Sequence, residues 1–209
     1  MNEIVDEINR VHREVGKSGP PTVLLRRSYD AAIADVWQAC TDPARLRRWF
    51  LPVSGDLRVG GRYQLQGNAG GEILACEAPG LLRVSWGMGD GQPSEVTVRL
   101  SAIDAATTEF ELEHGRCGDP EQWARFGPGS VGVGWDLLLS SLRMHLAGAA
   151  LGDPAEWAVS SAYREQIGAT VKVWVAAHEA AGVAAEQAEA NGRETLAFYL
   201  PPTDQPPAN

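Results

Sequence analysis

Strict alternation of apolar and polar side chains marks a series of short segments in the middle of the chain. In the segment 107–115, Phe110, Leu112 and His114 fall on one side, and glutamates occupy the positions between them. A period of two is typical of antiparallel strands with one buried and one solvated face. Glycines separate these segments, which indicates a meander with short turns. The pattern predicts strands over residues 22–29, 60–67, 72–80, 81–87, 94–104 and 107–115.

Helical spacing of apolar residues appears in three further segments. Two short helices are predicted directly after the first strand, over 33–42 and 43–50. Asp42 suits the N-cap of the second helix, and Pro43 suits its first position. A longer helix is predicted to start after an N-cap at Ser130, and at 1.5 Å per residue it reaches about 25 Å, enough to cross a curved sheet. Its apolar stripe consists of Trp135, Leu139, Leu142 and Leu146.

This order of elements predicts the class of the fold. A strand, two short helices, a strand meander and a long closing helix is the order of an α+β, helix-grip (START/Bet v 1-like) fold. In such a fold a curved antiparallel sheet wraps around the long C-terminal helix. The predicted domain covers residues 22–150, and a Gly- and Pro-rich loop over 115–130 precedes its long helix.

Three segments lie outside this domain. Residues 1–21 are expected to form an N-terminal helix or arm, with weak helical periodicity to Val15, followed by a linker. Residues 153–199 are predicted to form a helical extension, with Gly182 as a C-cap and a second helix after it. Its apolar stripe must be buried on the domain or across a dimer. The proline-rich tail 200–209 is expected to be disordered. The stripe consists of Trp157, Tyr163, Ile167, Val171, Trp174 and His178.

Composition and charge exclude several classes of partner. A net charge of −9 without a basic stripe disfavours nucleic acids and anionic membranes. No secretory signal and no membrane-spanning run is present, so a cytoplasmic protein without membrane insertion is predicted. Three scattered cysteines are expected to be reduced thiols, and four scattered histidines form no metal-binding spacing. We therefore expect neither a metal nor another cofactor.

Several of these segments are similar to a known family. SYDAAIADVWQACTDPARLRRWF (28–50), GDLRVGGRY (55–63), EVTVRL (95–100), ELEHG (111–115) and GVGWDLLLSSL (132–142) resemble the SRPBCC (START/Bet v 1-like) superfamily. The nearest branch is the one named after the activator of the heat-shock-protein-90 ATPase, in its bacterial single-domain form with a C-terminal helical extension. The resemblance implies an apolar cavity between sheet and long helix, with chemistry that differs between branches.

The candidate site residues are mostly aromatic. Pockets for small apolar ligands are lined chiefly by hydrophobic and aromatic side chains, but the same residues could equally be core. Trp123 and Phe126 favour a cavity, because they are apolar residues in a polar loop near its expected mouth. Asp136 and Arg143 are interpreted as a solvated flank of the long helix. The predicted ligand-binding residues are Trp49, Phe50, Tyr63, Leu65, Trp86, Phe110, His114, Trp123, Phe126, Trp135 and Leu139.

His114 is the one titratable group that strand alternation turns inward, so it is the candidate catalytic residue. A single histidine without a predictable carboxylate or nucleophile beside it is more often structural. The leading hypothesis is therefore a binding protein for a small hydrophobic molecule. An enzyme of cyclase, aromatase or hydrolase type, using His114 with Tyr63 or Asp136, is one alternative. A protein-interaction or chaperone-linked module is the other, and a homodimer could form through the C-terminal helices.

Overall fold

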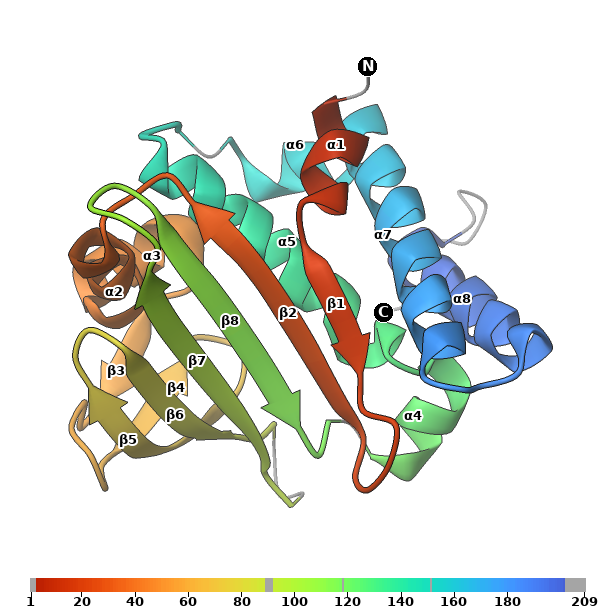
Figure 1. The fold of residues 1–209 in the computed structure, drawn as a ribbon, viewed down its shortest axis with the longest axis horizontal. Helices are drawn as coiled ribbons and strands as arrows, with labels where there is room; N and C mark the ends of the chain where they lie inside the picture. The colour runs from red at the N-terminus through yellow and green to blue at the C-terminus, as the bar shows by residue number, and fades with distance from the viewer. Residues whose placement is uncertain (1–2, 89–91, 118, 151, 202–209) are drawn as a thin grey trace.

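The computed structural model describes residues 3–88, 92–117, 119–150 and 152–201. Within these residues an eight-stranded antiparallel sheet has the order β1-β2-β8-β7-β6-β5-β4-β3 (Figure 1). A long helix, α5, lies across one face of this sheet, which confirms the predicted α+β helix-grip class. The strands are β1 (His12–Val15), β2 (Thr22–Tyr29), β3 (Val53–Gly55), β4 (Arg62–Leu65), β5 (Gly70–Glu77), β6 (Leu81–Trp86), β7 (Ser94–Ala102) and β8 (Thr108–Gly115).

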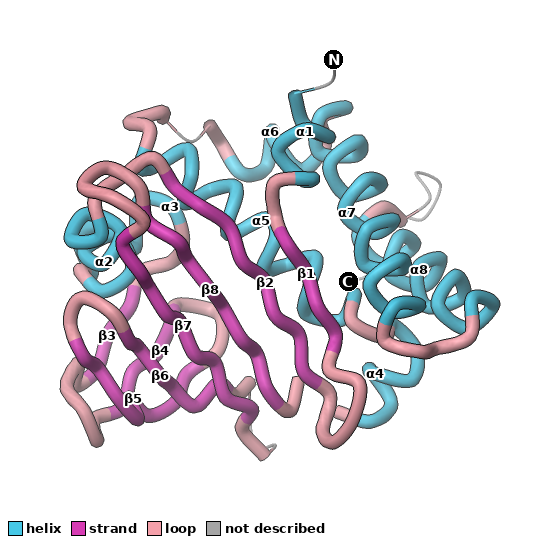
Figure 2. Tube along the Cα trace, viewed as in Figure 1, coloured by secondary structure: helices cyan, strands magenta, loops and turns pink. Residues whose placement is uncertain are grey.

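Apart from α4, α5 and α6, the helices form two groups around the sheet. Two of them, α2 and α3, follow β2 directly and lie at the end of α5 near β7. In contrast, α1, α7 and α8 gather beside β1, the sheet edge opposite β3 (Figure 2). The helices are α1 (Glu3–Asn9), α2 (Ile33–Thr41), α3 (Pro43–Trp49), α4 (Pro120–Phe126), α5 (Gly129–Leu146), α6 (Pro154–Ala158), α7 (Ser161–Ala180) and α8 (Ala185–Tyr199).

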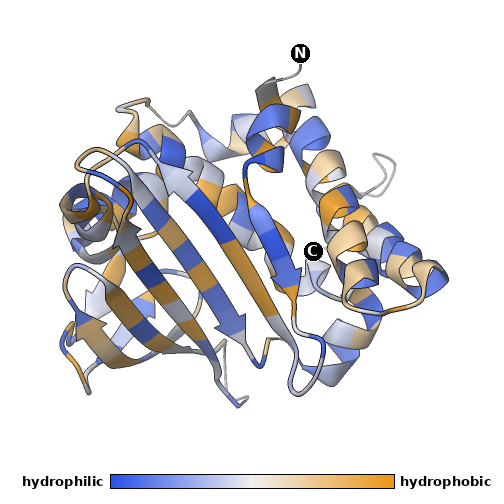
Figure 3. Cartoon of the chain, viewed as in Figure 1, coloured by the Kyte–Doolittle hydropathy of each residue, from blue (hydrophilic) through white to orange (hydrophobic). Residues whose placement is uncertain are grey.

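The strand alternation found in the sequence is confirmed. Along β8 buried and half-buried residues alternate without a break, and Phe110, Leu112 and His114 are all buried. The glutamates between them face outward, where Glu111 pairs with Arg26 of β2 at 2.8 Å. The bands of hydrophobic and hydrophilic residues across the strands are visible in Figure 3. The inner face is therefore supplied by every second residue of these strands.

Asp-Pro pairs begin three of the helices. The predicted cap at Asp42 is confirmed, since its carboxylate accepts a hydrogen bond from the N–H of Ala44 at 2.7 Å. The same signal at Asp119 starts α4, so the prediction of a loop over 115–130 was wrong in its middle. Asp153 starts α6 in the same way. The helix at Pro154 falls at the start of the predicted helical extension, whereas the one at Pro120 was not predicted.

The start of the long helix differs from its prediction. It begins at Gly129 after Pro128, so Ser130 lies inside the first turn and is not the N-cap. Its hydroxyl is buried without a hydrogen-bond partner among the described residues. The chain enters the helix through Gly127, which has a φ of 56°, a conformation that favours glycine. This turn places the helix start two residues earlier than a serine cap at Ser130 would.

The N-terminal segment is a helix only as far as Asn9. Residues 12–15 form β1 instead, antiparallel to β2, and Val15 enters the core. The prediction of a separate arm followed by a linker was therefore wrong in this part, because the segment adds an edge strand to the sheet. Four residues are too few for period-two alternation to be recognised beside a weak helical pattern.

The C-terminal extension packs on the domain. Ile167, Val171 and Trp174 of α7 are buried in the same core cluster as the sheet. Burial of the predicted stripe on α7 therefore does not require a dimer. Gly132 of α5 permits this contact, since a Cβ there would lie 2.4 Å from the Trp174 ring. Helix α8 ends at Tyr199, close to the predicted end. The tail predicted to be disordered falls, from residue 202 onward, outside the described residues.

Candidate ligand cavity

A cavity of about 100 Å³ lies between α5, the pair α2–α3 and the inner face of β6, β7 and β8. Strand alternation explains the sheet wall, since each strand contributes residues two positions apart. Helix α5 contributes Trp135, Leu138 and Leu139, which share one helical face. The remaining wall comes from α2, α3 and the residue after α3. The lining residues are Cys40, Leu46, Trp49, Phe50, Leu82, Val84, Trp86, Val96, Val98, Phe110, Leu112, Trp135, Leu138 and Leu139.

The lining carries almost no polar chemistry. Among the described residues, no charged side chain borders the cavity. The indole N–H of Trp49 donates to the carbonyl oxygen of Ala39 at 3.0 Å, so it is already used. Burial raises the pKa of the Cys40 thiol to about 12, so the thiol stays neutral. The cavity is suited to bind apolar groups and is poorly suited to bind charged ones.

The structure brings six of the eleven predicted site residues to this cavity. They are Trp49, Phe50, Trp86, Phe110, Trp135 and Leu139. Sequence analysis missed eight others, although the alternation that identified Phe110 also points to Leu112, Val96 and Val98. The missed residues are Cys40, Leu46, Leu82, Val84, Val96, Val98, Leu112 and Leu138.

Four predicted residues lie elsewhere. Tyr63 and Leu65 are buried on β4, away from the cavity lining, and the Tyr63 hydroxyl donates to the carbonyl oxygen of Ser85 at 2.8 Å. Trp123 and Phe126 lie on α4 rather than at the cavity mouth. The Trp123 ring packs edge-on against His178 of α7. Phe126 borders a separate void of about 10 Å³ between α5, α7 and α8, which is about the size of one water molecule.

His114 lies beside the cavity, behind Trp135. Its Nδ1 accepts a hydrogen bond from the indole N–H of Trp135 at 3.1 Å, so the imidazole proton must be on Nε2. That nitrogen is 2.7 Å from the hydroxyl of Ser94, which itself donates to the carbonyl oxygen of Trp86. Both ring nitrogens are therefore occupied, and neither is free to remove a proton. The geometry supports the structural interpretation of His114.

The environment of His114 predicts a pH-dependent stability. Burial lowers the pKa of His114 to about 4 from an ordinary value near 6.5. Since the folded state resists protonation, the contribution of neutral His114 is complete above pH 6.5 and is lost as the pH falls towards 4. We expect the free energy of unfolding to drop by about 3 kcal/mol across this interval from this group.

The measurement is urea unfolding at pH 7, 6, 5 and 4 on the wild type and on His114→Gln. Carboxylates titrate in the same range, so the readout is the difference between the two pH profiles. The variant should have the flatter profile. Parallel profiles would contradict the assignment of a buried, neutral imidazole.

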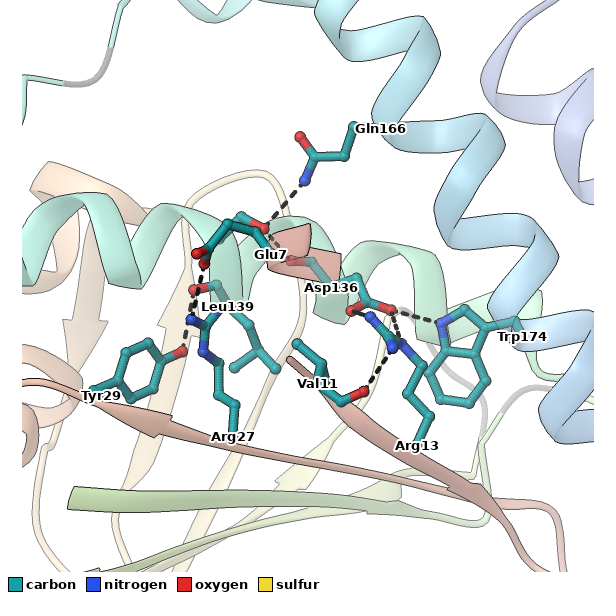
Figure 4. A network of polar contacts seen from close by, with 10 residues as sticks. Glu7, Val11, Arg13, Arg27, Tyr29, Asp136, Leu139, Gln166 and Trp174 are labelled. Atoms are coloured by element: carbon teal, nitrogen blue, oxygen red, sulfur yellow. Dashed lines mark hydrogen bonds and ion pairs between the residues drawn. The ribbon is translucent and has the colours of Figure 1, made fainter. Parts of the chain in front are cut away.

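Asp136 corrects a sequence interpretation. Its position on the helix predicts a solvated flank, but its side chain is only 4% exposed. Arg13 of β1 binds both of its oxygens, at 2.6 and 3.0 Å, and the indole N–H of Trp174 donates to it at 2.7 Å (Figure 4). Burial raises the pKa of the Asp136 carboxyl, while Arg13 and Trp174 act in the opposite direction. The carboxylate joins β1, α5 and α7 at one point.

A second ion cluster fastens the N-terminal helix nearby. The Glu7 carboxylate of α1 contacts the guanidinium of Arg27 on β2 at 3.2 Å and that of Arg143 on α5 at 3.1 Å. Arg10 contacts its other oxygen at 2.9 Å. Arg143, also interpreted as a solvated flank, is half-buried and ion-paired. The N-terminal segment and the extension thus contact α5 through Asp136, Ser140 and Arg143, none of which lines the cavity.

Neither a metal site nor a membrane-spanning helix is found in the described ranges. In residues 3–88, 92–117, 119–150 and 152–201, no cluster of three or more His, Cys, Asp or Glu side chains could hold a metal ion. None of the helices in these ranges combines the length and the apolarity that a bilayer span requires.

An apolar cavity enclosed by a curved antiparallel sheet and a long helix defines a helix-grip protein. The family model for "Activator of Hsp90 ATPase homolog 1-like protein" matches residues 30–147, more than half of the chain. The chain belongs to this family, a branch of the SRPBCC (START/Bet v 1-like) superfamily. A search of curated proteins finds no significant match.

Solved structures agree with this assignment. The crystal structure of CalU16 from Micromonospora echinospora is 35% identical and covers 83% of this chain and 99% of that one, with a TM-score of 0.65. Its solution NMR structure is 36% identical and covers 82% and 97% of the two chains, with a TM-score of 0.67. Protein MLL2253 from Mesorhizobium loti is 23% identical and covers 62% and 99%, and its TM-score of 0.52 shows the same fold.

Proposed function

We propose that the protein binds a small hydrophobic molecule in the cavity between the sheet and α5. The observation that carries this proposal is the unfilled, uncharged space of about 100 Å³ between the sheet, α5 and the pair α2–α3. Protein interiors are usually close-packed and an apolar void lowers stability, so the presence of this space supports a binding role. A ligand that buries about 200 Å² of apolar surface would gain about 5 kcal/mol, a submillimolar affinity.

The enzyme alternative has less support. His114 has no free nitrogen, and both of its suggested partners are engaged elsewhere. Tyr63 donates its hydroxyl proton to a backbone oxygen. Asp136 is held by Arg13 and Trp174 on the other side of α5. A general base needs hydrogen-bond reach to its substrate, and none of these three side chains is among the residues that line the cavity.

The interaction-module alternative would require a filled interior and a large exposed apolar patch. The interior is not filled, and the exposed large hydrophobics belong to separate segments, such as Met88 after β6, Val159 after α6 and Phe198 on α8. A homodimer through the C-terminal helices would have to use Phe198 and its neighbours, because the stripe on α7 is already buried. Equilibrium sedimentation tests that state independently of ligand binding.

Quenching of tryptophan emission by bromobenzene tests the binding proposal, since a heavy atom close to an indole quenches its fluorescence. We expect saturable quenching, because Trp86 and Trp135 border the cavity with ring centroids 5.1 Å apart. Val98→Phe fills the space and should abolish saturation. Val59→Phe makes the same substitution at a residue that is 57% exposed and should leave saturation intact. Linear, non-saturating quenching in all three proteins would contradict the proposed binding function.

A further inference from the structure

Three tryptophan indoles border the cavity, and they differ in whether their N–H is used. Trp49 donates to the carbonyl oxygen of Ala39, and Trp135 donates to Nδ1 of His114. Trp86 makes no hydrogen bond through its indole nitrogen within the described part of the chain. Its side chain is only half-buried, and the nitrogen is not among the buried polar atoms left without a partner. Of the three indole donors, the one of Trp86 is therefore the one without a hydrogen-bond partner in the described part of the chain.

The rest of the wall excludes charge. No Lys, Arg or His is among the fourteen lining residues, so a carboxylate or phosphate inside the cavity would have no counter-ion. No acidic side chain lines it either, so an ammonium group would be equally unpaired. An unpaired ion in an apolar environment is strongly disfavoured. The ligand must therefore be neutral at its buried end.

The volume limits the size of the ligand. Pockets for drug-sized ligands usually measure about 300–1,000 Å³, several times the volume found here. An apolar cavity of about 150 Å³ in another protein is known to hold benzene. A space of about 100 Å³ therefore accommodates roughly one ring or a short branched chain. Trp86, Trp135 and Phe110 provide aromatic surfaces for such a group.

We propose that the bound molecule is neutral and about the size of a single aromatic ring, with one hydrogen-bond acceptor that the indole N–H of Trp86 recognises. This inference rests on the proposed binding function and specifies its ligand class. Trp86 is then the residue that selects an acceptor-bearing ligand over a plain hydrocarbon. Trp49 and Trp135 act as walls, because their N–H groups are already committed.

Calorimetric titration with four probes tests the inference on the full-length protein. Toluene is neutral without an acceptor, benzonitrile adds one acceptor, benzoate adds a charge, and 2-cyanonaphthalene adds a second ring. We expect benzoate and 2-cyanonaphthalene to bind at least 100-fold more weakly than benzonitrile. Trp86→Phe removes the donor and keeps an aromatic wall, so it should weaken benzonitrile about fivefold and change toluene less than twofold. Trp49→Phe is the matched control and should change both probes by the same factor.

A second measurement uses the wild type alone, so its result does not depend on whether the variants fold. Benzonitrile should shift the Trp86 indole N–H proton resonance downfield, and toluene should not. Equal responses to the two probes, or tight binding of benzoate or 2-cyanonaphthalene, would overturn this inference and leave the binding function standing. If none of the four probes binds, the proposed function itself fails, and the ligand class fails with it.

Discussion

Replacement of Asp136 by alanine is expected to lower the free energy of unfolding by about 3–5 kcal/mol. The substitution leaves the Arg13 guanidinium, only 5% exposed, without its counter-charge, and it leaves the Trp174 indole N–H without an acceptor. Breaking one side of a buried pair costs more than the pair contributes, because the remaining charge stays desolvated. Urea unfolding followed by far-UV circular dichroism at pH 7 gives the value.

Two further variants make this result specific. Glu194→Ala breaks the surface pair with Arg125, whose two side chains are 47% and 64% exposed, and should cost less than about 1 kcal/mol. The double variant Arg13→Ala/Asp136→Ala should be less unstable than the sum of the single variants, since no unpaired charge remains. An Asp136→Ala loss no larger than that of Glu194→Ala would show that the carboxylate does not hold β1, α5 and α7 together.

Trp174→Ala and Trp86→Ala are expected to differ strongly although both remove an indole. Trp174 is 2% exposed and packs against Gly132, so its loss leaves a void in a filled region and should cost about 3–5 kcal/mol. Trp86 borders existing space and touches fewer atoms on that side, so its loss should cost about 1–2 kcal/mol. Guanidinium unfolding of both variants in one buffer measures the difference. Equal, core-sized losses would mean that the interior beside Trp86 is packed and not hollow.

Local patterns were sufficient to predict the architecture and part of the cavity. The inward positions of β8 follow from period-two alternation around Phe110, and the helix α3 follows from the Asp42–Pro43 pair. These features depend on neighbours a few residues away, which a single sequence displays. The eight cavity residues that were missed lie mostly on the same alternating faces. Aliphatic side chains on these faces are equally typical of a packed core, so alternation alone does not identify them as cavity lining.

The contacts of Asp136 could not be predicted in this way. Its position beside Trp135 on α5 indicates a flank of the apolar stripe, but nothing local indicates that the flank is covered. The covering groups come from far away, since Arg13 lies 123 residues earlier and Trp174 lies 38 residues later. Both belong to segments that the sequence placed outside the domain. A lone acidic residue next to a buried stripe is the only local sign of such a contact.

The two sides of α5 have different functions in this account. Trp135, Leu138 and Leu139 face the cavity, while Asp136 and Ser140 face the extension, where Gln166 donates to the Ser140 hydroxyl at 3.1 Å. The ion pairs and hydrogen bonds on the outer side hold the helix against β1 and α7. These contacts can therefore hold α5 away from the sheet, so that the space between the helix and the sheet stays unfilled. We infer that these polar contacts, made on another side of the same helix, help to keep the uncharged cavity open.

Methyl chemical shifts in the presence of toluene test the central claim most directly, because they locate the bound molecule. With ¹³C-labelled valine and leucine methyl groups, we predict saturable shifts for Leu82, Val98 and Leu138, which line the cavity, and none for Val175 on α7 or Leu196 on α8. Shifts confined to the α8 region, or no saturable shift at any methyl group, would contradict a ligand cavity between the sheet and α5.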